Sequence, residues 1–380
     1  AVEPGPGRRG PAWNRERPYL ATVACSRLLT GAGALKPVCH VELAVDADAL
    51  SYRAGDSLGV VPSNDPELVA AVLGHLGEDP ELDVDGRPLR AVLTGSYEIS
   101  RPSRELVEEI GRRTEDAELA ALLAGSDRRA LHEFLWARDV LDLLELPIRT
   151  PLTVRELLAA LSPLAHRSYS ISSSPLVDPG RVGLTVASLR YSAAGRNRAG
   201  VCSTHLADRL TEGDDARVFL VPNETFRPPT DDTVDMIMVG PGTGVAPFRA
   251  FLHERRARGA SGRNWLFFGA RHQRCDSLYA DELGEMRREG TLTRLDVAFS
   301  RDSRPKTYVQ ALMREHGKQL YAWLADGASL YVCGDATRMA GDVDEAVHEI
   351  VAEHGGLSSE DAAGYVDGLR RGHRYLRDVY

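Results

Sequence analysis

Strand-like and helix-like segments alternate from Asp235 to the C-terminus, and this alternation constrains the fold more than any other feature. Apolar stretches that suit buried strands are each followed by a more polar or helix-like stretch, as in MIMVGPGTGVAPFRAFLHERR, NWLFFGARH, LTRLDVAFSRD and SLYVCGDATRMAGDVDEAVHEIVAEHG. Strands that alternate with helices at this spacing form a parallel sheet with helices on its faces. We therefore predict a parallel-sheet α/β domain over residues 231–380.

A helical stretch interrupts the strand patterns of the preceding part. Strand-like residues begin at Tyr19 and resume in RVGLTVASLRY and ARVFLVP. Between them, PELVAAVLGHLG, ELVEEIGRR and ALHEFLWARDVLDLLEL carry apolar residues at helical spacing. The pattern predicts one β-rich domain, residues 19–65 and 150–230, around a helical insert, residues 66–149. Pro and Gly are dense in residues 1–18, which is typical of a linker after an upstream domain.

Composition and charge exclude several classes of protein. The formal net charge of −9 provides no overall positive field for nucleic acid. No stretch approaches the ~18 uninterrupted apolar residues that a membrane helix requires. The five cysteines are scattered without a CxxC pair and the histidines form no HExxH motif, so we predict neither a disulfide framework nor a metal site. A reducing, cytoplasmic location fits these cysteines best.

Two segments of the C-terminal domain have residues suited to a dinucleotide. Glycines in Gly240-Pro241-Gly242-Thr243-Gly244 stand at a strand-to-helix turn, where the backbone can approach a pyrophosphate; the alternative is a turn that serves packing alone. Ser300-Arg301 and Lys306-Thr307-Tyr308-Val309-Gln310 follow a later strand and supply cations and hydroxyls. Such groups suit a 2′-phosphate, which favours NADP over NAD, although a solvated charged loop has a similar composition.

A third segment, RSYSISSSP, begins at Arg167 and follows an apolar helix-like stretch. Arg167 can pair with a phosphate, Tyr169 offers a flat face to a ring, and Ser170 can hydrogen-bond a heteroaromatic edge. Downstream, Gly200 to Ser203 open a helix-like segment whose backbone N–H groups could hold a second pyrophosphate. Two phosphate sites favour two dinucleotides, whereas either segment alone would read as an ordinary serine-rich loop or capped helix.

Taken together, the chain resembles the FAD/NADPH-binding half of the diflavin reductases. The resemblance extends from Pro18 to Tyr380 and rests on RSYSISSS, GVCSTHLADRL, NETFRPP, VGPGTGVAPFRAFLHER, NWLFFGAR, AFSRD, KTYVQ, YVCGDATRMAGDV and RYLRDVY. Within that family the chain is most similar to the flavoprotein (alpha) subunits of assimilatory NADPH-sulfite reductase. The resemblance to this family implies a ferredoxin-NADP reductase-like fold. In that fold, an antiparallel FAD-binding β-barrel with a helical connecting insert precedes a parallel-sheet NADP-binding domain.

The resemblance also implies which residues contact FAD. Arg167 would meet the pyrophosphate, Tyr169 would pack on the flavin and Ser170 would lie near its N5 atom. Further FAD contacts would be Thr185, Val186, Tyr191, Gly200, Val201, Cys202 and Ser203. The family more often has glycine where Ala187 stands. The terminal Tyr380 would stack over the isoalloxazine and move aside for nicotinamide.

For NADPH, the resemblance implies a 2′-phosphate site and a catalytic set. The nucleotide contacts would be Gly242, Thr243, Ser300, Arg301, Lys306, Tyr308, Gln310 and Asp342, and the catalytic residues Ser170, Cys333, Asp378 and Tyr380. Asp378 would stabilise the positive charge that develops on nicotinamide as hydride leaves. Without the resemblance, Cys333 would be interpreted as a small buried residue at a strand end and Tyr380 as a frayed terminus.

The implied function is an FAD-dependent reductase module that oxidises NADPH. Electrons would pass singly through an FMN-containing, flavodoxin-like domain, which normally precedes this half, to an acceptor such as the sulfite reductase hemoprotein. Alternatives are the same module serving an assimilatory nitrate reductase or a haem monooxygenase, or a flavin- and nucleotide-binding module without turnover. Trp136, Trp265 and Trp323 are expected to pack in apolar surroundings, and Glu282, Glu285 and Glu289 to form a solvated helix face.

Overall fold

The computed structural model describes residues 13–193 and 195–380 and contains two compact units. The first unit comprises residues 13–59, 168–187 and 211–380, and the second comprises residues 60–167, 188–193 and 195–210. Of the predicted linker, residues 1–12 lie outside the described residues. Trp13 donates a hydrogen bond from Nε1 to the carbonyl of Ala49 at 3.0 Å.

A six-stranded antiparallel sheet forms the β-rich part, as predicted. Its strands lie in the order β6 (Arg167–Ser170), β3 (Ser57–Val61), β10 (Asp215–Val221), β1 (Tyr19–Leu28), β2 (Val38–Ala44) and β7 (Arg181–Ala187). The first and last strands of this order approach each other just beyond β6, where Ile171 bridges Leu184 in antiparallel fashion. The amide of Ser172 also donates to the carbonyl of Gly183 at 2.7 Å. These bonds close the sheet into a barrel.

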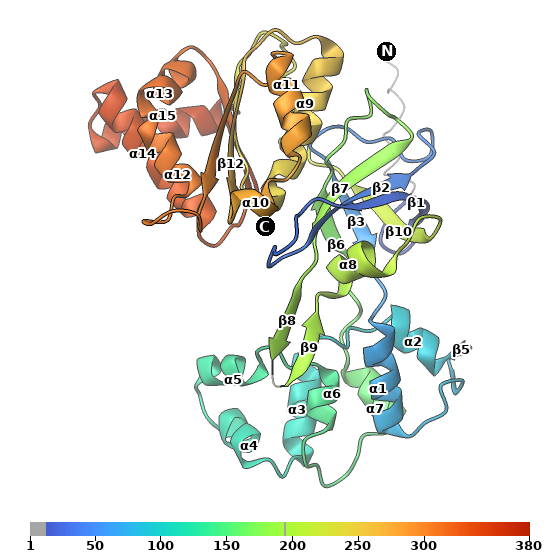
Figure 1. Ribbon diagram of the computed structural model, residues 1–380. Helices are drawn as coiled ribbons and strands as arrows, with labels where there is room; N and C mark the ends of the chain where they lie inside the picture. Colours follow the sequence, from blue (N-terminus) through green and yellow to red (C-terminus); the bar gives the residue numbers. More distant parts are fainter. Residues whose placement is uncertain (1–12, 194) are drawn as a thin grey trace, which may run out of the picture. The chain divides into compact units, whose positions relative to one another are not determined.

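The C-terminal part is a parallel sheet between two layers of helices, which confirms the predicted parallel-sheet fold, whereas a domain boundary at residue 231 stays a prediction (Figure 1). The strand order is β13 (Arg294–Phe299), β12 (Asn264–Ala270), β11 (Met236–Val239), β14 (Ser329–Gly334) and β15 (Tyr375–Val379). One face carries α9 (Ala246–Arg258), α10 (Gln273–Asp276) and α11 (Ala280–Arg288), and the turn η2 (Gly242–Val245) precedes α9. The other face carries α12 (Val309–Glu315), α13 (Gly317–Ala325), α14 (Met339–Gly355) and α15 (Ser359–Arg371).

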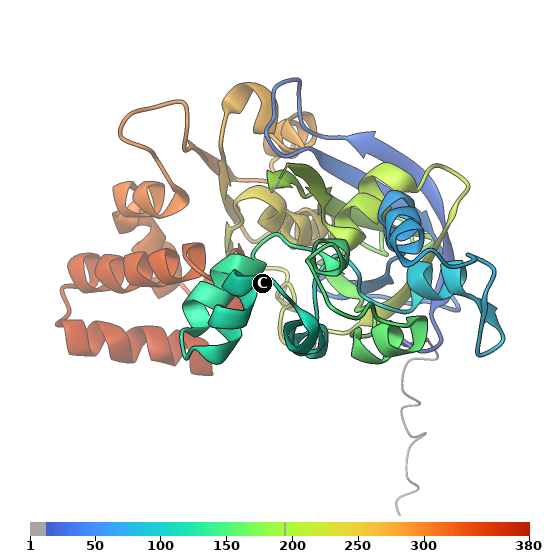
Figure 2. The same ribbon diagram turned by 90° about the horizontal axis from the view of Figure 1, so that it is seen from below.

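Residues of each central strand alternate between these two layers. Ile237 and Val239 of β11 pack into the core under α12 to α15, whereas Met236 and Met238 pack under α9 and α11. A strand buried on both faces needs apolar residues at successive positions, which accounts for the continuous run MIMV. The helices α14 and α15, drawn in red, lie side by side in Figure 2.

The second unit is mainly helical and has its own core. Its helices are α1 (Pro66–Leu76), α2 (Leu89–Gly95), α3 (Arg104–Arg113), α4 (Ala117–Ala124), α5 (Arg128–Leu135), α6 (Val140–Leu144) and α7 (Val154–Ala160). Short strands β4 (Asp83–Val84) and β5 (Arg87–Pro88) form a small hairpin. The core extends from Val69 to Leu161. The domain boundaries at residues 65 and 150 remain predictions.

The segment RVGLTVASLRY is two strands rather than one. It divides into β7 of the barrel and β8 (Arg190–Ala193), which pairs with β9 (Arg196–Ala199) in a hairpin of the second unit. A short helix α8 (Val201–Thr204) and a π-helical turn η1 (His205–Arg209) follow. Among the described helices of both units, none is both long and apolar enough to cross a membrane.

Candidate functional site

Three of the four predicted catalytic residues meet at one edge of the parallel sheet. Cys333 of β14 and Asp378 of β15 are register partners near the carboxyl ends of their strands. Ser170, the last residue of β6, donates a hydrogen bond from Oγ to Asp378 Oδ2 at 3.0 Å. In open parallel sheets, ligands bind at this end of the strands. The fold therefore brings a hydroxyl, a thiol and a carboxylate from three distant segments to a position suited to a ligand.

Burial determines the protonation of this group. It raises the pKa of the Cys333 thiol, and the neighbouring Asp378 carboxylate raises it further, so the thiol stays neutral. Burial also raises the pKa of Asp378, while the hydrogen bond from Ser170 favours the charged form. The neutral Cys333 thiol thus lies beside the Asp378 carboxylate, and the hydrogen bond from Ser170 favours the charged form of that carboxylate.

Tyr380 is held by two backbone hydrogen bonds, and its exposed ring makes a hydrogen bond through the hydroxyl. Its amide donates to the carbonyl of Gly334 at 3.1 Å, and its carbonyl accepts from the amide of Ala336 at 3.0 Å. The side chain is 64% exposed, and its hydroxyl lies 2.9 Å from the hydroxyl of Thr243 in the glycine turn. The ring can therefore change rotamer while the chain end stays in place, as the predicted stacking role requires.

The glycine turn has features of both alternatives that the sequence left open, which are close packing and approach of the backbone to a pyrophosphate. A Cβ atom at Gly240 would lie 2.6 Å from the carbonyl oxygen of Gly244, and one at Gly244 would lie 2.2 Å from that of Cys333. Those two glycines permit close packing. Gly242 differs, because its φ of 58° favours glycine and a Cβ there would meet no atom within 4 Å. No side chain caps η2 or α9. The turn therefore presents backbone N–H groups on its open side.

Two of the predicted 2′-phosphate residues, Ser300 and Arg301, lie at the same edge of the sheet, directly after β13. The amide of Ser300 donates to the carbonyl of Ala270, and that of Arg301 to the carbonyl of Arg271, both at 2.9 Å. Arg271 is a second cation opposite Arg301, and sequence reasoning missed it. Its position directly after a strand, like that of Ser300-Arg301, was the available signal.

The structure joins only some of the other predicted 2′-phosphate residues. Lys306 and Tyr308 are exposed in the loop after β13. Gln310 donates from Nε2 to Asp342 Oδ2 at 3.0 Å, which joins two predicted contacts. The Asp302 carboxylate is engaged away from Arg301, since it lies 2.7 Å from His272 Nδ1 and accepts the amide of Gln273 at 2.7 Å. Within this loop, the carboxylate nearest in sequence to Arg301 is therefore already hydrogen-bonded.

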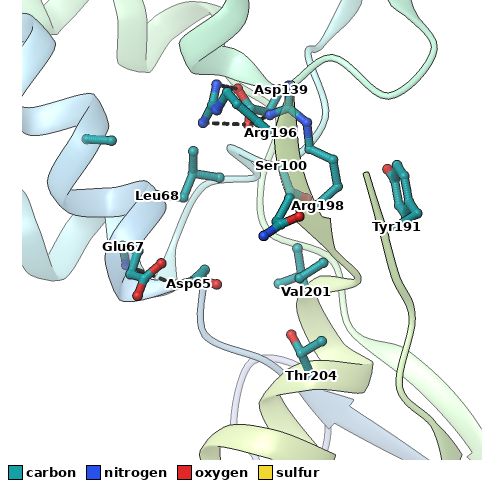
Figure 3. A pocket seen from close by; sticks show the side chains of 13 residues that line it. Asp65, Glu67, Leu68, Ser100, Asp139, Tyr191, Arg196, Arg198, Val201 and Thr204 are labelled. Atoms are coloured by element: carbon teal, nitrogen blue, oxygen red, sulfur yellow. Dashed lines mark hydrogen bonds and ion pairs between the residues drawn. The ribbon is translucent and has the colours of Figure 1, made fainter. Parts of the chain in front are cut away.

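The second unit contains a cavity of about 420 Å³ that includes predicted FAD contacts (Figure 3). Tyr191 and Val201 line it, as do Arg196 and Arg198 of the hairpin. Figure 3 shows Tyr191 on the side opposite Leu68 and Glu67 of α1. The cavity brings together an aromatic ring, the start of α8 and two guanidinium groups that are themselves paired with carboxylates. The ring offers a flat surface to a base or flavin, and the start of α8 offers backbone N–H groups.

Gly200, directly before α8, has a packing reason to be glycine. A Cβ atom there would lie 2.6 Å from Ser203 Oγ and 3.0 Å from Leu189 Cβ. No side chain caps this helix start. Ser203 Oγ accepts the amide of Leu189 at 3.2 Å, which ties α8 to the chain before β8. Cys202 is buried, so a ligand contact there would be made by its backbone, whereas the side chain of Val201 lines the cavity.

Two arginines of the hairpin pair with two aspartates at the start of α6. Arg198 contacts Asp139, and its Nη2 lies 2.7 Å from Asp142 Oδ2. Arg196 Nη1 lies 2.8 Å from Asp142 Oδ1 and its Nη2 3.2 Å from Asp139 Oδ2. Asp139 and Asp142 also form a reciprocal capping box. The network therefore fixes the hairpin that carries Tyr191 and leads into Gly200.

The remaining predicted FAD contacts are distributed between the two units. In the first, Thr185 and Val186 are buried on β7 and Tyr169 is half-buried on β6. In the second, Arg167 is half exposed; Nη1 donates to the carbonyl of His166 at 3.1 Å, and Nη2 lies 3.8 Å from Glu98. Arg167 Nη1 also donates to the carbonyl of Ala165 at 3.2 Å, so the preceding backbone holds the guanidinium at a half-exposed position.

Two expectations about packing residues were wrong. Trp265 and Trp323 are buried, but the side chain of Trp136 is 65% exposed and its ring lies 6.0 Å from that of Tyr191. Apolar neighbours in the sequence could not reveal this, because Trp136 ends α5 and the chain then turns at Ala137 with φ of 62°. Glu282 is not solvated: it is half-buried and paired with Arg249 and His253.

Comparison with known proteins gives two family matches. A model described as an FAD binding domain matches residues 11–205, and one described as an oxidoreductase NAD-binding domain matches residues 238–345. The chain is 42% identical to a Bacillus subtilis protein and 43% identical to one from Pectobacterium atrosepticum, each named the flavoprotein alpha-component of NADPH sulfite reductase. The alignments cover 97% of this chain and 62% and 61% of those relatives, so the chain spans about three-fifths of their length.

Proposed function

Because the chain belongs to the FAD-binding domain family, we propose that it is the NADPH-oxidising reductase module of a sulfite reductase flavoprotein. The observation that carries the proposal is the Ser170–Asp378 hydrogen bond beside Cys333, at the carboxyl edge of a sheet that matches an oxidoreductase NAD-binding domain. Bound FAD would supply the redox chemistry, because it can accept a hydride from NADPH and release electrons singly.

The roles that we propose for the chain's residues follow from their chemistry. The Asp378 carboxylate would stabilise positive charge on an adjacent nicotinamide, and Ser170 would hold that carboxylate in place by its hydroxyl. Cys333, as a neutral buried thiol, would fill the space beside them without adding charge. The Tyr380 ring would cover the same place until nicotinamide enters.

Nucleotide selection would depend on the ends of β12 and β13. We propose that Arg301, Ser300, Lys306 and Tyr308 hold the 2′-phosphate of NADPH, with Gln310 and Asp342 beside them. Guanidinium and ammonium groups pair strongly with phosphate and have no comparable partner in NADH. Gly242 and Thr243 would face the pyrophosphate.

FAD fits the residues that are present in each unit. In the second, the proposed contacts are Arg167, Tyr191, Gly200, Val201, Cys202 and Ser203, and the cavity lined by Tyr191 and Val201 supports them. In the first, they are Tyr169, Ser170, Thr185, Val186 and Tyr380. The partners that we propose are an FMN-containing, flavodoxin-like domain or protein and the sulfite reductase hemoprotein. The relatives are named alpha-components of sulfite reductase, which supports a further component of that enzyme as a partner.

Steady-state oxidation of NADPH tests the proposal without any partner protein. The FAD-loaded chain is mixed with NADPH and ferricyanide, an artificial acceptor, and nucleotide oxidation is followed by absorbance. Turnover that requires FAD and is faster with NADPH than with NADH is the expected result. A chain that retains FAD but does not oxidise NADPH would be a binding module, and the proposed function would be wrong.

A further inference from the structure

A buried polar cluster lies where the barrel strands of the first unit meet α9 and α11. Its central residue is Tyr279, which directly precedes α11 and is 5% exposed. Its φ of 55° lies in the left-handed region, which residues other than glycine adopt only at an energetic cost. The surrounding contacts must therefore hold Tyr279 in this conformation. The partners of its side chain show what the conformation achieves.

The Tyr279 hydroxyl bridges two strands of the barrel. It lies 2.9 Å from His40 Nδ1 on β2 and 2.7 Å from Thr185 Oγ1 on β7. His40 and Thr185 are register partners, so their side chains leave the same face of the barrel side by side. Thr185 also belongs to the strand segment that we propose as an FAD contact. One hydroxyl from the α/β part thus holds both strands at this position.

The direction of each hydrogen bond can be assigned. His40 Nε2 lies 2.9 Å from Glu42 Oε1, a carboxylate that can only accept, so Nε2 carries a proton. Burial lowers the pKa of His40, and the nearby Arg249 lowers it further, which favours a neutral ring with Nδ1 as an acceptor. Tyr279 then donates to His40, and Thr185 donates to Tyr279. Each of these bonds has one donor and one acceptor.

Arg249 of α9 completes the connection. Its guanidinium lies over the Tyr279 ring, 5.0 Å from the centroid, and its Nε lies 2.9 Å from Glu282 Oε1. Arg249 Nη1 donates to the carbonyl of Ser172 at 2.7 Å. Ser172 is two residues after Ser170, the donor to Asp378. The cluster therefore holds both β7 and the segment that carries Ser170.

We propose that Tyr279 is a positioning residue, which with Arg249 fixes the nucleotide-binding sheet on the barrel strands at the distance that flavin reduction requires. The inference rests on the proposed function. Transfer between two bound rings needs their reacting atoms at roughly 3 to 3.5 Å, and a displacement of about 1 Å can lower the rate about 100-fold. Hydrogen bonds are directional, so this buried junction fixes an alignment that apolar packing alone would leave free to slide.

Tyr279→Phe tests the inference because it keeps the ring and removes both hydroxyl bonds. We expect the rate of flavin reduction by NADPH to fall about 10- to 100-fold. Flavin content should stay within about twofold, since the strand that carries Thr185 remains paired with β2 along its length. The Kd for NADP⁺ should stay within about twofold as well, since Tyr279 touches neither proposed phosphate site. The isotope effect with NADPH deuterated at nicotinamide C4 should rise, because misalignment slows the transfer itself.

A second readout uses the chain without any cofactor. Hydrogen–deuterium exchange at amides of residues 171–174 and 277–283 should be faster in Tyr279→Phe, while residues 359–371 should be unaffected. The matched control is Tyr365→Phe on α15, where the ring packs 6.1 Å from that of Tyr321. Tyr365→Phe removes a hydroxyl from a helix on the opposite face of the parallel sheet. It should change neither hydrogen–deuterium exchange in residues 171–174 and 277–283 nor the rate of flavin reduction.

The outcomes separate the inference from the function on which it rests. If NADPH fails to reduce the flavin of the wild-type chain, the proposed function is wrong and the inference fails with it. If the wild type is reduced and Tyr279→Phe stays within about twofold of its rate, only the positioning role is wrong. A variant that loses flavin or nucleotide binding in proportion to its rate would also overturn that role.

Discussion

At the scale of single residues, burial and partners determine what each charged group can do. Asp378 accepts a hydroxyl hydrogen bond in a half-buried position, whereas Arg301 is exposed at a strand end with a second cation, Arg271, opposite it. The sequence indicated Asp378 and Arg301 through their motifs. It could not indicate Glu282, whose partners Arg249 and His253 lie on another helix, nor the exposure of Trp136.

Arg301→Ala should weaken recognition of the 2′-phosphate. Loss of a charge-assisted bond of about 1.5–3 kcal/mol raises the KM for NADPH about 10- to 100-fold and leaves the KM for NADH nearly unchanged. Steady-state kinetics with both nucleotides measures the difference. Arg304→Ala, in the same exposed loop, is a matched control for general charge. Equal effects of Arg301→Ala on both nucleotides would contradict a role at the 2′-phosphate.

The raised pKa of Asp378 predicts a pH dependence. In the role that we propose, the carboxylate is the active form, and burial raises its pKa above the ordinary value of 3.8. The rate of flavin reduction should therefore rise with pH as Asp378 ionises and then level off. Asp378→Asn should lower the plateau about 10- to 100-fold and remove this acidic limb. Rapid-mixing measurements from the lowest pH at which the chain keeps its flavin to about pH 9 test this; an unchanged limb in the variant would assign it to another group.

At the scale of elements, local patterns and long-range pairing were not equally predictable. The start of α9 at Ala246 and the parallel sheet followed from apolar runs and glycine punctuation. Closure of the barrel by Ile171 and Leu184 leaves no local pattern, because it joins segments whose pairing depends on the whole sheet. The break between β7 and β8 was also missed, since both halves of RVGLTVASLRY have strand composition.

The hairpin β8–β9 should depend on Arg198 more than on Arg196. The Arg198 side chain is 6% exposed and the Arg196 side chain is 32% exposed, although both pair with Asp139 and Asp142. Arg198→Met leaves a buried carboxylate without its main partner, which costs about 3–5 kcal/mol. Arg196→Met, the matched control, should cost at most about 1 kcal/mol. Thermal unfolding of both variants measures this, and a larger loss in Arg196→Met would contradict the assignment.

At the scale of the whole molecule, the two units have different tasks. The second provides a nucleotide-sized cavity and a hairpin held by ion pairs, whereas the first carries the sheet edge with Ser170, Cys333, Asp378 and Tyr380. The resemblance to diflavin reductases implied these four residues as a catalytic set, and their roles stay a prediction. It could not anticipate the Tyr279 cluster, because hydrogen bonds among buried groups from β2, β7 and the start of α11 leave no motif.

The most direct test of the central claim is anaerobic stopped-flow of the FAD-loaded chain, mixed first with NADPH and then, separately, with NADH. The visible flavin absorbance follows reduction in a single turnover, with no acceptor present. The account predicts rapid bleaching by NADPH and much slower bleaching by NADH. Bound flavin that NADPH cannot bleach, or that both nucleotides bleach equally fast, would contradict it.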